Sequence, residues 1–138
     1  QRHFLFPLLL TRFRGWDLVA ADVDEARRRA DADWIATAGY GPTAMLAYHL
    51  PGVPVIQLDE RIRYDNAPPP DPALLERPGL LVADVRSRKT DALAGRFKEH
   101  VELGVVRRWA AGLPVSTYRL VALSAPKGDP LGDVGATD

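Results

Sequence analysis

Residues 33–58 read DWIATAGYGPTAMLAYHLPGVPVIQL and hold two short apolar runs on either side of an alanine-rich segment. Asp33 to Ala38 is short, apolar and bounded by polar and glycine residues, which predicts a buried strand. Thr43 to Leu50 is an apolar segment that Pro51-Gly52 ends, which predicts a helix. Val53 to Leu58 predicts a second buried strand. A strand, a helix and a strand in this order are typical of a parallel α/β sheet.

The flanking sequence adds further elements to this unit. The residue patterns predict a helix at about 17–31, one helical turn over Pro72 to Glu76, a strand over Gly79 to Val85, a short helix over Asp91 to His100, and two antiparallel strands, Val101 to Trp109 and Val115 to Leu123. The polar, proline-rich stretch from Asp59 to Pro72 predicts an extended loop. We therefore predict an α/β fold with a small parallel sheet, Rossmann-like and three-layered, that a C-terminal antiparallel hairpin extends.

Length and charge limit the possible classes of protein. The chain has 138 residues, which predicts a single domain over residues 15–124, followed by a disordered tail over 125–138. Lysine plus arginine and aspartate plus glutamate both number 18, so the net charge is zero. A neutral chain is a poor candidate for a dedicated nucleic-acid binder, and we expect no nucleic-acid partner. The absence of cysteine excludes disulfides, iron–sulfur clusters, thiolate zinc sites and a cysteine nucleophile.

The first fourteen residues differ from the rest of the chain. Phe4 to Leu10 is the longest apolar run, and Arg12 and Arg14 follow it directly. Seven residues are too few for a membrane-spanning helix, which needs about 20. We expect residues 1–14 to form an N-terminal arm packed on the domain, or a membrane-proximal stub. Because the chain begins with Gln1 and its only methionine is Met45, we also expect it to be part of a longer polypeptide.

The chain offers few catalytic or cofactor motifs. Gly39-Tyr40-Gly41 lies where a phosphate-binding turn would lie in a nucleotide-binding fold, but the third glycine of the dinucleotide fingerprint is missing. Pro42 fits the first position of the following helix and removes an N–H that a phosphate could use. We therefore favour a structural turn and expect no cofactor. The three histidines show no metal-ligand spacing, so we expect no metal, and no serine lies in a Gly-x-Ser-x-Gly elbow.

The densest polar cluster is Asp59 to Asn66, directly after the second predicted strand. Open α/β sheets bind ligands at the carboxyl ends of their strands. Carboxylates, arginines and a tyrosine at this position could bind a sugar or a phosphate. The alternative is a solvated loop with local ion pairs.

One stretch resembles a known family. Residues 37–55 combine Tyr40, an alanine-rich helix and the sequence Tyr48-His-Leu-Pro-Gly-Val-Pro54, after a Gly15-Trp16 helix opening and before Arg61 and Tyr64-Asp65. This order resembles the soluble C-terminal domains of bacterial dolichyl-phosphate-mannose protein mannosyltransferase-like membrane enzymes, close to the lipid A aminoarabinose transferase type. The resemblance covers about residues 15–124. The chain departs from it by having Ala47 and His49 around Tyr48, and Arg63 before Tyr64.

The resemblance implies an integral-membrane glycosyltransferase that takes a sugar from a polyprenyl-phosphate donor. The catalytic acid of such enzymes lies in an early loop between membrane helices, so this domain would carry no catalytic residue and be inactive alone. It would lie on the extracytoplasmic, periplasmic face of the inner membrane and cap the active site. Its partners would be the membrane-embedded part of the same polypeptide and a lipid-linked sugar and acceptor. The substrate-binding residues it implies are Tyr40, Tyr48, Arg61, Tyr64 and Asp65.

Two other functions fit the same residues. The Gly39 turn and the polar loop would suit a stand-alone α/β module that binds a nucleotide or another small ligand. A protein-interaction domain of a larger assembly would bind no small molecule at all.

Overall fold

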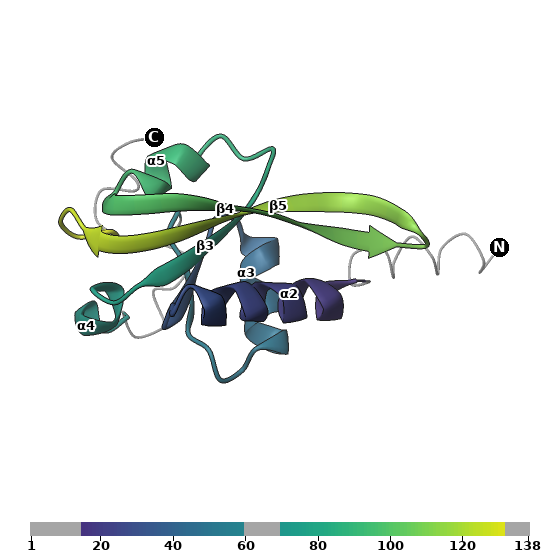
Figure 1. Ribbon diagram of the computed structural model, residues 1–138, viewed down its shortest axis with the longest axis horizontal. Coiled ribbons are helices and arrows are strands. Elements are labelled where there is room, and N and C mark those ends of the chain that lie inside the picture. The colour runs from purple at the N-terminus through teal and green to yellow at the C-terminus, as the bar shows by residue number, and fades with distance from the viewer. Residues whose placement is uncertain (1–14, 60–69, 132–138) are drawn as a thin grey trace.

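The computed structural model describes residues 15–59 and 70–131. They form one five-stranded sheet in the order β2-β1-β3-β5-β4, with helices packed against it (Figure 1). The strands are β1 (Trp34–Thr37), β2 (Val55–Gln57), β3 (Gly79–Asp84), β4 (Phe97–Ala110) and β5 (Leu113–Pro126). The helices are α2 (Trp16–Arg29), α3 (Tyr40–His49), α4 (Pro72–Leu75) and α5 (Thr90–Ala94).

The sheet is mixed. β1 pairs in parallel with both β2 and β3, while β5 pairs antiparallel with β3 and with β4. Ile35 at the centre of β1 lies between Val55 of β2 and Leu80 of β3. The chain is therefore an α/β protein, and the predicted parallel strands and C-terminal antiparallel hairpin are confirmed.

The central strands β1 and β3 are buried on both faces, and their successive residues, which point to opposite sides, enter two different hydrophobic clusters. One hydrophobic cluster joins Ile35 to α2 and α3 through Trp16, Val19 and Leu46. The other cluster joins Trp34 to α4 and α5, and its helix residues are Leu75, Leu93 and Ala94. All four residues of β1 are buried, which explains why this strand has no polar, solvent-facing alternation.

Trp34 lies at the centre of the second cluster. It is fully buried, its ring lies 6.2 Å from that of Phe97, and its indole N–H donates to the carbonyl of Arg77 at 2.9 Å. Its partner across the parallel ladder is Gly79. The ring occupies the space beside Gly79 where a side chain would lie.

Two helix predictions need correction. The helix predicted over Asp91 to His100 is wrong in its second half, since α5 ends at Ala94 and β4 begins at Phe97. The helical spacing of Leu93, Ala94 and Phe97 is therefore misleading. All three enter the same core, but Leu93 and Ala94 belong to α5 and Phe97 belongs to β4. The helix predicted from Thr43 starts earlier, at Tyr40, so Pro42 is its third residue rather than its first.

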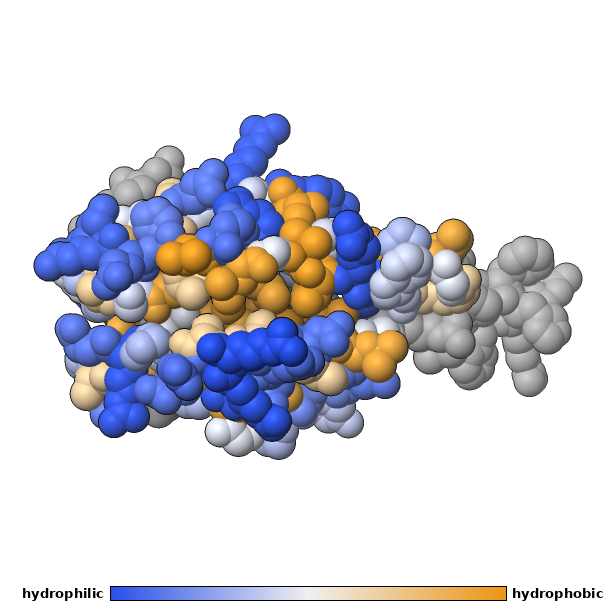
Figure 2. Space-filling model, viewed as in Figure 1, coloured by the Kyte–Doolittle hydropathy of each residue, from blue (hydrophilic) through white to orange (hydrophobic). Residues whose placement is uncertain are grey.

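The C-terminal hairpin is longer than predicted. β4 and β5 each have 14 residues and join through Ala111 and Gly112, which both have positive φ, 53° and 77°. Two left-handed residues match the right-handed twist of a hairpin. β4 is an edge strand that exposes Val101, Leu103 and Val105. In Figure 2, apolar residues, in orange, gather in the middle of the face between hydrophilic residues, in blue.

The described chain continues beyond the predicted end of the domain. β5 continues to Pro126, the Lys127 N–H donates to the Arg96 carbonyl at 2.8 Å, and Leu131 is buried in the core. The sequence analysis assigned residues 125–131 to the tail, whereas in the structure they extend β5 and return to the core. The N-terminal arm, most of the predicted loop after Asp59 and residues 132–138 lie outside the described residues.

Candidate functional site at the carboxyl ends of the parallel strands

The sheet order places one candidate site at the carboxyl ends of β1 and β3. The chain leaves β1 through α3 toward β2, whereas it leaves β3 through α5 toward the opposite edge of the sheet. α3 and α5 also pack on opposite faces. Open α/β sheets commonly bind ligands where neighbouring strands send their connections apart in this way.

Gly39 shapes the exit from β1. Its φ of 97° and ψ of 149° are conformations that a glycine adopts readily and other residues avoid. Its N–H donates to both carboxylate oxygens of Asp59, at 3.2 and 3.1 Å, and the side-chain amide of Gln57 donates to the same carboxylate at 2.8 Å. The end of β2 is thereby joined to the end of β1.

Two buried threonines complete this junction. The Thr43 hydroxyl donates to the Gly39 carbonyl at 2.6 Å and lies 2.6 Å from the hydroxyl of Thr37. These contacts hold the first turn of α3 against β1. The Gly39-Tyr40-Gly41 segment thus leads into α3. Hydrogen bonds from Thr43 and to Asp59 hold it in place.

Asp59 determines which ligands suit this junction. The start of a helix ordinarily attracts anions through its free N–H groups and its dipole. Here the Asp59 carboxylate already accepts the Gly39 N–H, so a phosphate would meet a fixed negative charge. The geometry therefore favours a structural role for the turn and neutral or cationic ligand groups beside it.

The predicted site residues are only partly brought together. Tyr40 begins α3 and is 58% exposed, and Tyr48 lies on its last turn and is 77% exposed. Eight residues of helix separate them by about 12 Å along the axis, so one ligand would have to be elongated to reach both. Tyr48 also packs edge-on against His49, with ring centroids 5.1 Å apart. Arg61, Tyr64 and Asp65 lie outside the described residues.

The end of β3 carries a carboxylate and an arginine. Asp84 accepts the backbone N–H of Arg86 at 2.8 Å and two guanidinium hydrogen bonds, at 3.1 and 2.9 Å. These bonds from the Arg86 side chain hold the pKa of Asp84 below its ordinary value. The pair fixes the bend that leads from β3 toward α5.

This pair gives a pH-dependent prediction. Because the pKa of Asp84 is lower in the folded chain than in the unfolded chain, its contribution to stability is present above about pH 4 and is lost as the pH falls through the folded value. Asp84→Asn should therefore lower the free energy of unfolding slightly at pH 7 and much less at pH 3. Urea unfolding at the two pH values measures this difference. An equal decrease at both would show that the charge of Asp84 has no part in it.

A second ion cluster ties α5 to the hairpin. Arg119 of β5 donates to Glu102 of β4 at 2.6 Å and to Asp91 of α5 at 3.0 Å, which raises the pKa of Arg119 above its ordinary value. One guanidinium thus pairs with two carboxylates, one from β4 and one from α5. We assign this cluster a structural role.

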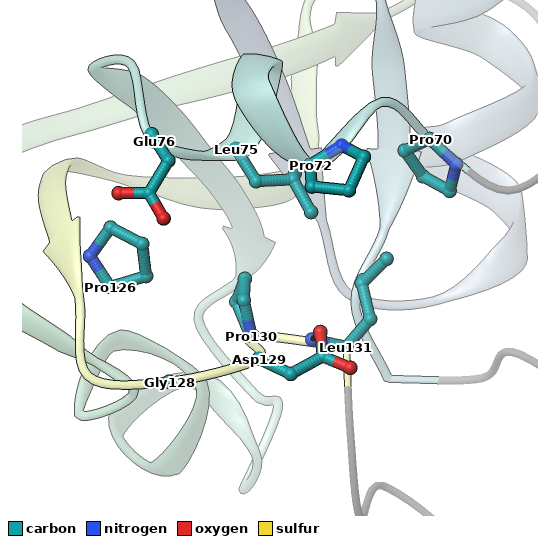
Figure 3. A pocket seen from close by; sticks show the side chains of 9 residues that line it. All are labelled: Pro70, Pro72, Leu75, Glu76, Pro126, Gly128, Asp129, Pro130 and Leu131. Atoms are coloured by element: carbon teal, nitrogen blue, oxygen red, sulfur yellow. Dashed lines mark hydrogen bonds between the residues drawn. The ribbon is translucent and has the colours of Figure 1, made fainter.

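A cavity of about 230 Å³ lies away from this edge, between α4 and the end of the described chain (Figure 3). Four prolines line it, together with Leu75, Glu76, Gly128, Asp129 and Leu131. Arg96 holds the lining residue Pro130 by donating to its carbonyl at 2.8 Å, and it also donates to the carbonyl of Leu58 at 3.3 Å. The cavity is smaller than a usual ligand pocket of about 300 Å³ or more.

No three histidine, aspartate or glutamate side chains within residues 15–59 and 70–131 are placed to hold a metal ion. In the same part of the chain, no helix has the length and apolar character needed to cross a membrane.

Sequence reasoning did not identify the junction between Gly39 and Asp59. Both residues belonged to predicted functional segments, but their contact depends on β1 and β2 being adjacent and parallel. Gln57 and Asp59 at the end of one parallel strand and a glycine at the end of its neighbour are a usable signal. The sequence contains no comparable pattern for Arg96. Its side chain donates to two backbone carbonyls, those of Leu58 and Pro130, which lie far from it in the sequence.

Comparison with known proteins identifies no relative: no family model, no curated protein and no solved structure matches this chain.

Proposed function

We propose that this chain is an extracytoplasmic accessory domain of an integral-membrane glycosyltransferase that uses a polyprenyl-phosphate sugar donor. It would cap the membrane active site and help to admit or orient the acceptor or the donor. The observation that carries the proposal is the order of pieces in residues 37–55, which resembles the corresponding segment of that enzyme family.

The surface of α3 supports this proposal. The resembling segment includes the whole of α3, and the two tyrosines that open and close the helix both present their rings to solvent. Tyrosine is well suited to sugar or lipid-linked ligands, because its ring offers an apolar face and its hydroxyl a hydrogen-bonding group. The spacing of Tyr40 and Tyr48 suits an extended ligand rather than a compact one.

The proposal extends to the architecture, the partners and the location. For the fold, we propose a Rossmann-like arrangement of three layers. The partners are the membrane-embedded part of the same polypeptide and, through it, a lipid-linked sugar and its acceptor, on the periplasmic side of the inner membrane. The isolated domain is expected to be inactive, because the family's catalytic acid belongs to the membrane-embedded part.

The first test is the coding sequence upstream of Gln1. Several apolar segments of about 20 residues, with an acidic residue in the first loop between them, would support the proposal. A start codon close to Gln1 without such segments would contradict it. A stand-alone ligand-binding module would then be the better explanation, and calorimetry of the 138-residue chain with nucleotides and small anions would test that module.

The second test changes the proposed binding surface in the intact enzyme. Combining Tyr40→Ala, Tyr48→Ala, Arg61→Ala and Tyr64→Ala should lower kcat/KM for sugar transfer at least about tenfold, since each aromatic contact contributes about 0.5–1.5 kcal/mol. Leu18→Ala is the matched control, because Leu18 is an exposed apolar residue on a different helix. Unchanged transfer by a folded quadruple variant would exclude the binding role.

A further inference from the structure

The turn of the β4–β5 hairpin lies beside the point where residue 14 joins the described chain. A Cβ atom added to Gly15 would come within 2.3 Å of the Trp109 carbonyl oxygen, so the two backbones are in direct contact. Next to them, Trp16 packs on Tyr118 with ring centroids 5.2 Å apart, and the Arg108 guanidinium lies over Trp16 at 5.6 Å. Gly15 and the start of α2 are therefore held at this end of the hairpin. Figure 1 shows the hairpin turn projecting past the start of α2.

Acidic residues are missing from the hairpin at this end, and also from the sequence that precedes α2. None of the 18 aspartates and glutamates falls within residues 1–16 or within residues 103–128. The first segment carries Arg2, Arg12 and Arg14, and the hairpin turn region carries Arg107 and Arg108. The hairpin turn region thus carries positive charge only, and the nearest carboxylate at the start of α2 is the exposed Asp17.

The same end of the hairpin exposes large apolar side chains. We define the hairpin tip as residues 107–115, in which Trp109 is 48%, Leu113 66% and Val115 36% exposed. Trp16 and Trp34 are buried, so Trp109 is the exposed tryptophan of the chain. Tryptophan beside arginine and aliphatic side chains is typical of surfaces that rest in the headgroup region of a bilayer.

We propose that the hairpin tip is a lipid-contacting surface that rests on a bilayer containing anionic headgroups. Leu113 and Val115 would enter the boundary between headgroups and acyl chains, with Trp109 at the level of the headgroups. Arg107 would attract lipid phosphates, and no carboxylate of the tip would oppose it. The exposed Trp109, Leu113 and Val115 side chains beside Arg107 make a lipid surface a better occupant than a polar protein partner.

This inference goes beyond the proposed function, since it names the surface that faces the membrane and does not depend on sugar transfer. A lipid-contacting tip could belong to a domain with no role in glycosyl transfer. Conversely, a glycosyltransferase domain could be held above the bilayer by its neighbouring segments alone. The two proposals therefore succeed or fail separately.

The test uses the full 138-residue chain and the fluorescence of Trp109. On phosphatidylcholine vesicles containing one quarter phosphatidylglycerol, the emission should shift to shorter wavelength and be quenched by lipids brominated near the headgroup. Pure phosphatidylcholine vesicles should bind at least about tenfold more weakly, because the arginine contribution is lost. Trp109→Phe should bind without the shift and the quenching, which would assign both signals to the tip.

Variants separate the tip from the N-terminal segment. Combining Leu113→Ser with Val115→Ser should weaken vesicle binding about tenfold, because two apolar side chains no longer enter the bilayer. Val101→Ser is the matched control, since Val101 is 60% exposed on the same strand pair but away from the turn, and it should leave binding unchanged. No binding, binding with unshifted Trp109 emission, or equal binding by the tip variant would each overturn the proposal.

Discussion

Gly79→Ala should lower the free energy of unfolding by about 3 kcal/mol, although it adds a single methyl group. The new Cβ would lie 2.5 to 2.9 Å from three atoms of the Trp34 indole ring. The ring cannot easily move away, because it is fully buried, packs against Phe97 and donates its N–H to the Arg77 carbonyl. The substitution therefore displaces the central side chain of one hydrophobic cluster.

Chemical denaturation measures this effect, and two further variants identify its cause. Gly41→Ala is the matched control, because Gly41 lies in α3 with no atom near its added Cβ, and alanine there should stabilise the chain by about 0.5 kcal/mol. Trp34→Phe combined with Gly79→Ala should cost less than the sum of the two single changes, since the smaller ring leaves room for the methyl group. Strict additivity would show that the ring of Trp34 does not fill this space.

The central strands could be predicted from sequence because their burial is continuous. β1 and β3 are short apolar runs bounded by turn residues, and a strand that is buried on both faces has that appearance. α5 could not be separated from β4 in the same way. Leu93, Ala94 and Phe97 have helical spacing, and only the pairing of β4 with β5 shows that Phe97 begins a strand.

The candidate site was less predictable than the fold for a related reason. The polar cluster after β2 was visible in the sequence, but the acceptor role of Asp59 toward Gly39 requires the parallel register of β1 and β2. The hairpin tip could likewise not be identified without the tertiary structure. Two segments without acidic residues are evident in the sequence, whereas their meeting at Gly15 and Trp109 depends on how α2 packs on β4.

Gly15→Ala should lower the free energy of unfolding by about 4 kcal/mol, from two separate causes. Gly15 has a φ of 78°, which costs an alanine about 1 kcal/mol. Its Cβ would also lie 2.3 Å from the Trp109 carbonyl oxygen and 3.2 Å from the Trp109 nitrogen. Backbone atoms within a paired strand cannot move aside as a flexible side chain can, so α2 must shift away from β4.

Gly112→Ala separates the two causes, because Gly112 has almost the same φ, 77°, and no atom within 4 Å of an added Cβ. It should cost only the conformational part, about 1 kcal/mol. The near-ultraviolet circular dichroism of Gly15→Ala should also change, since the shift of α2 alters the packing of Trp16 on Tyr118. Equal destabilisation by the two variants would mean that the close contact of Gly15 with Trp109 is absent. A larger effect at Gly15 would instead show that this contact fixes the start of α2 against the hairpin.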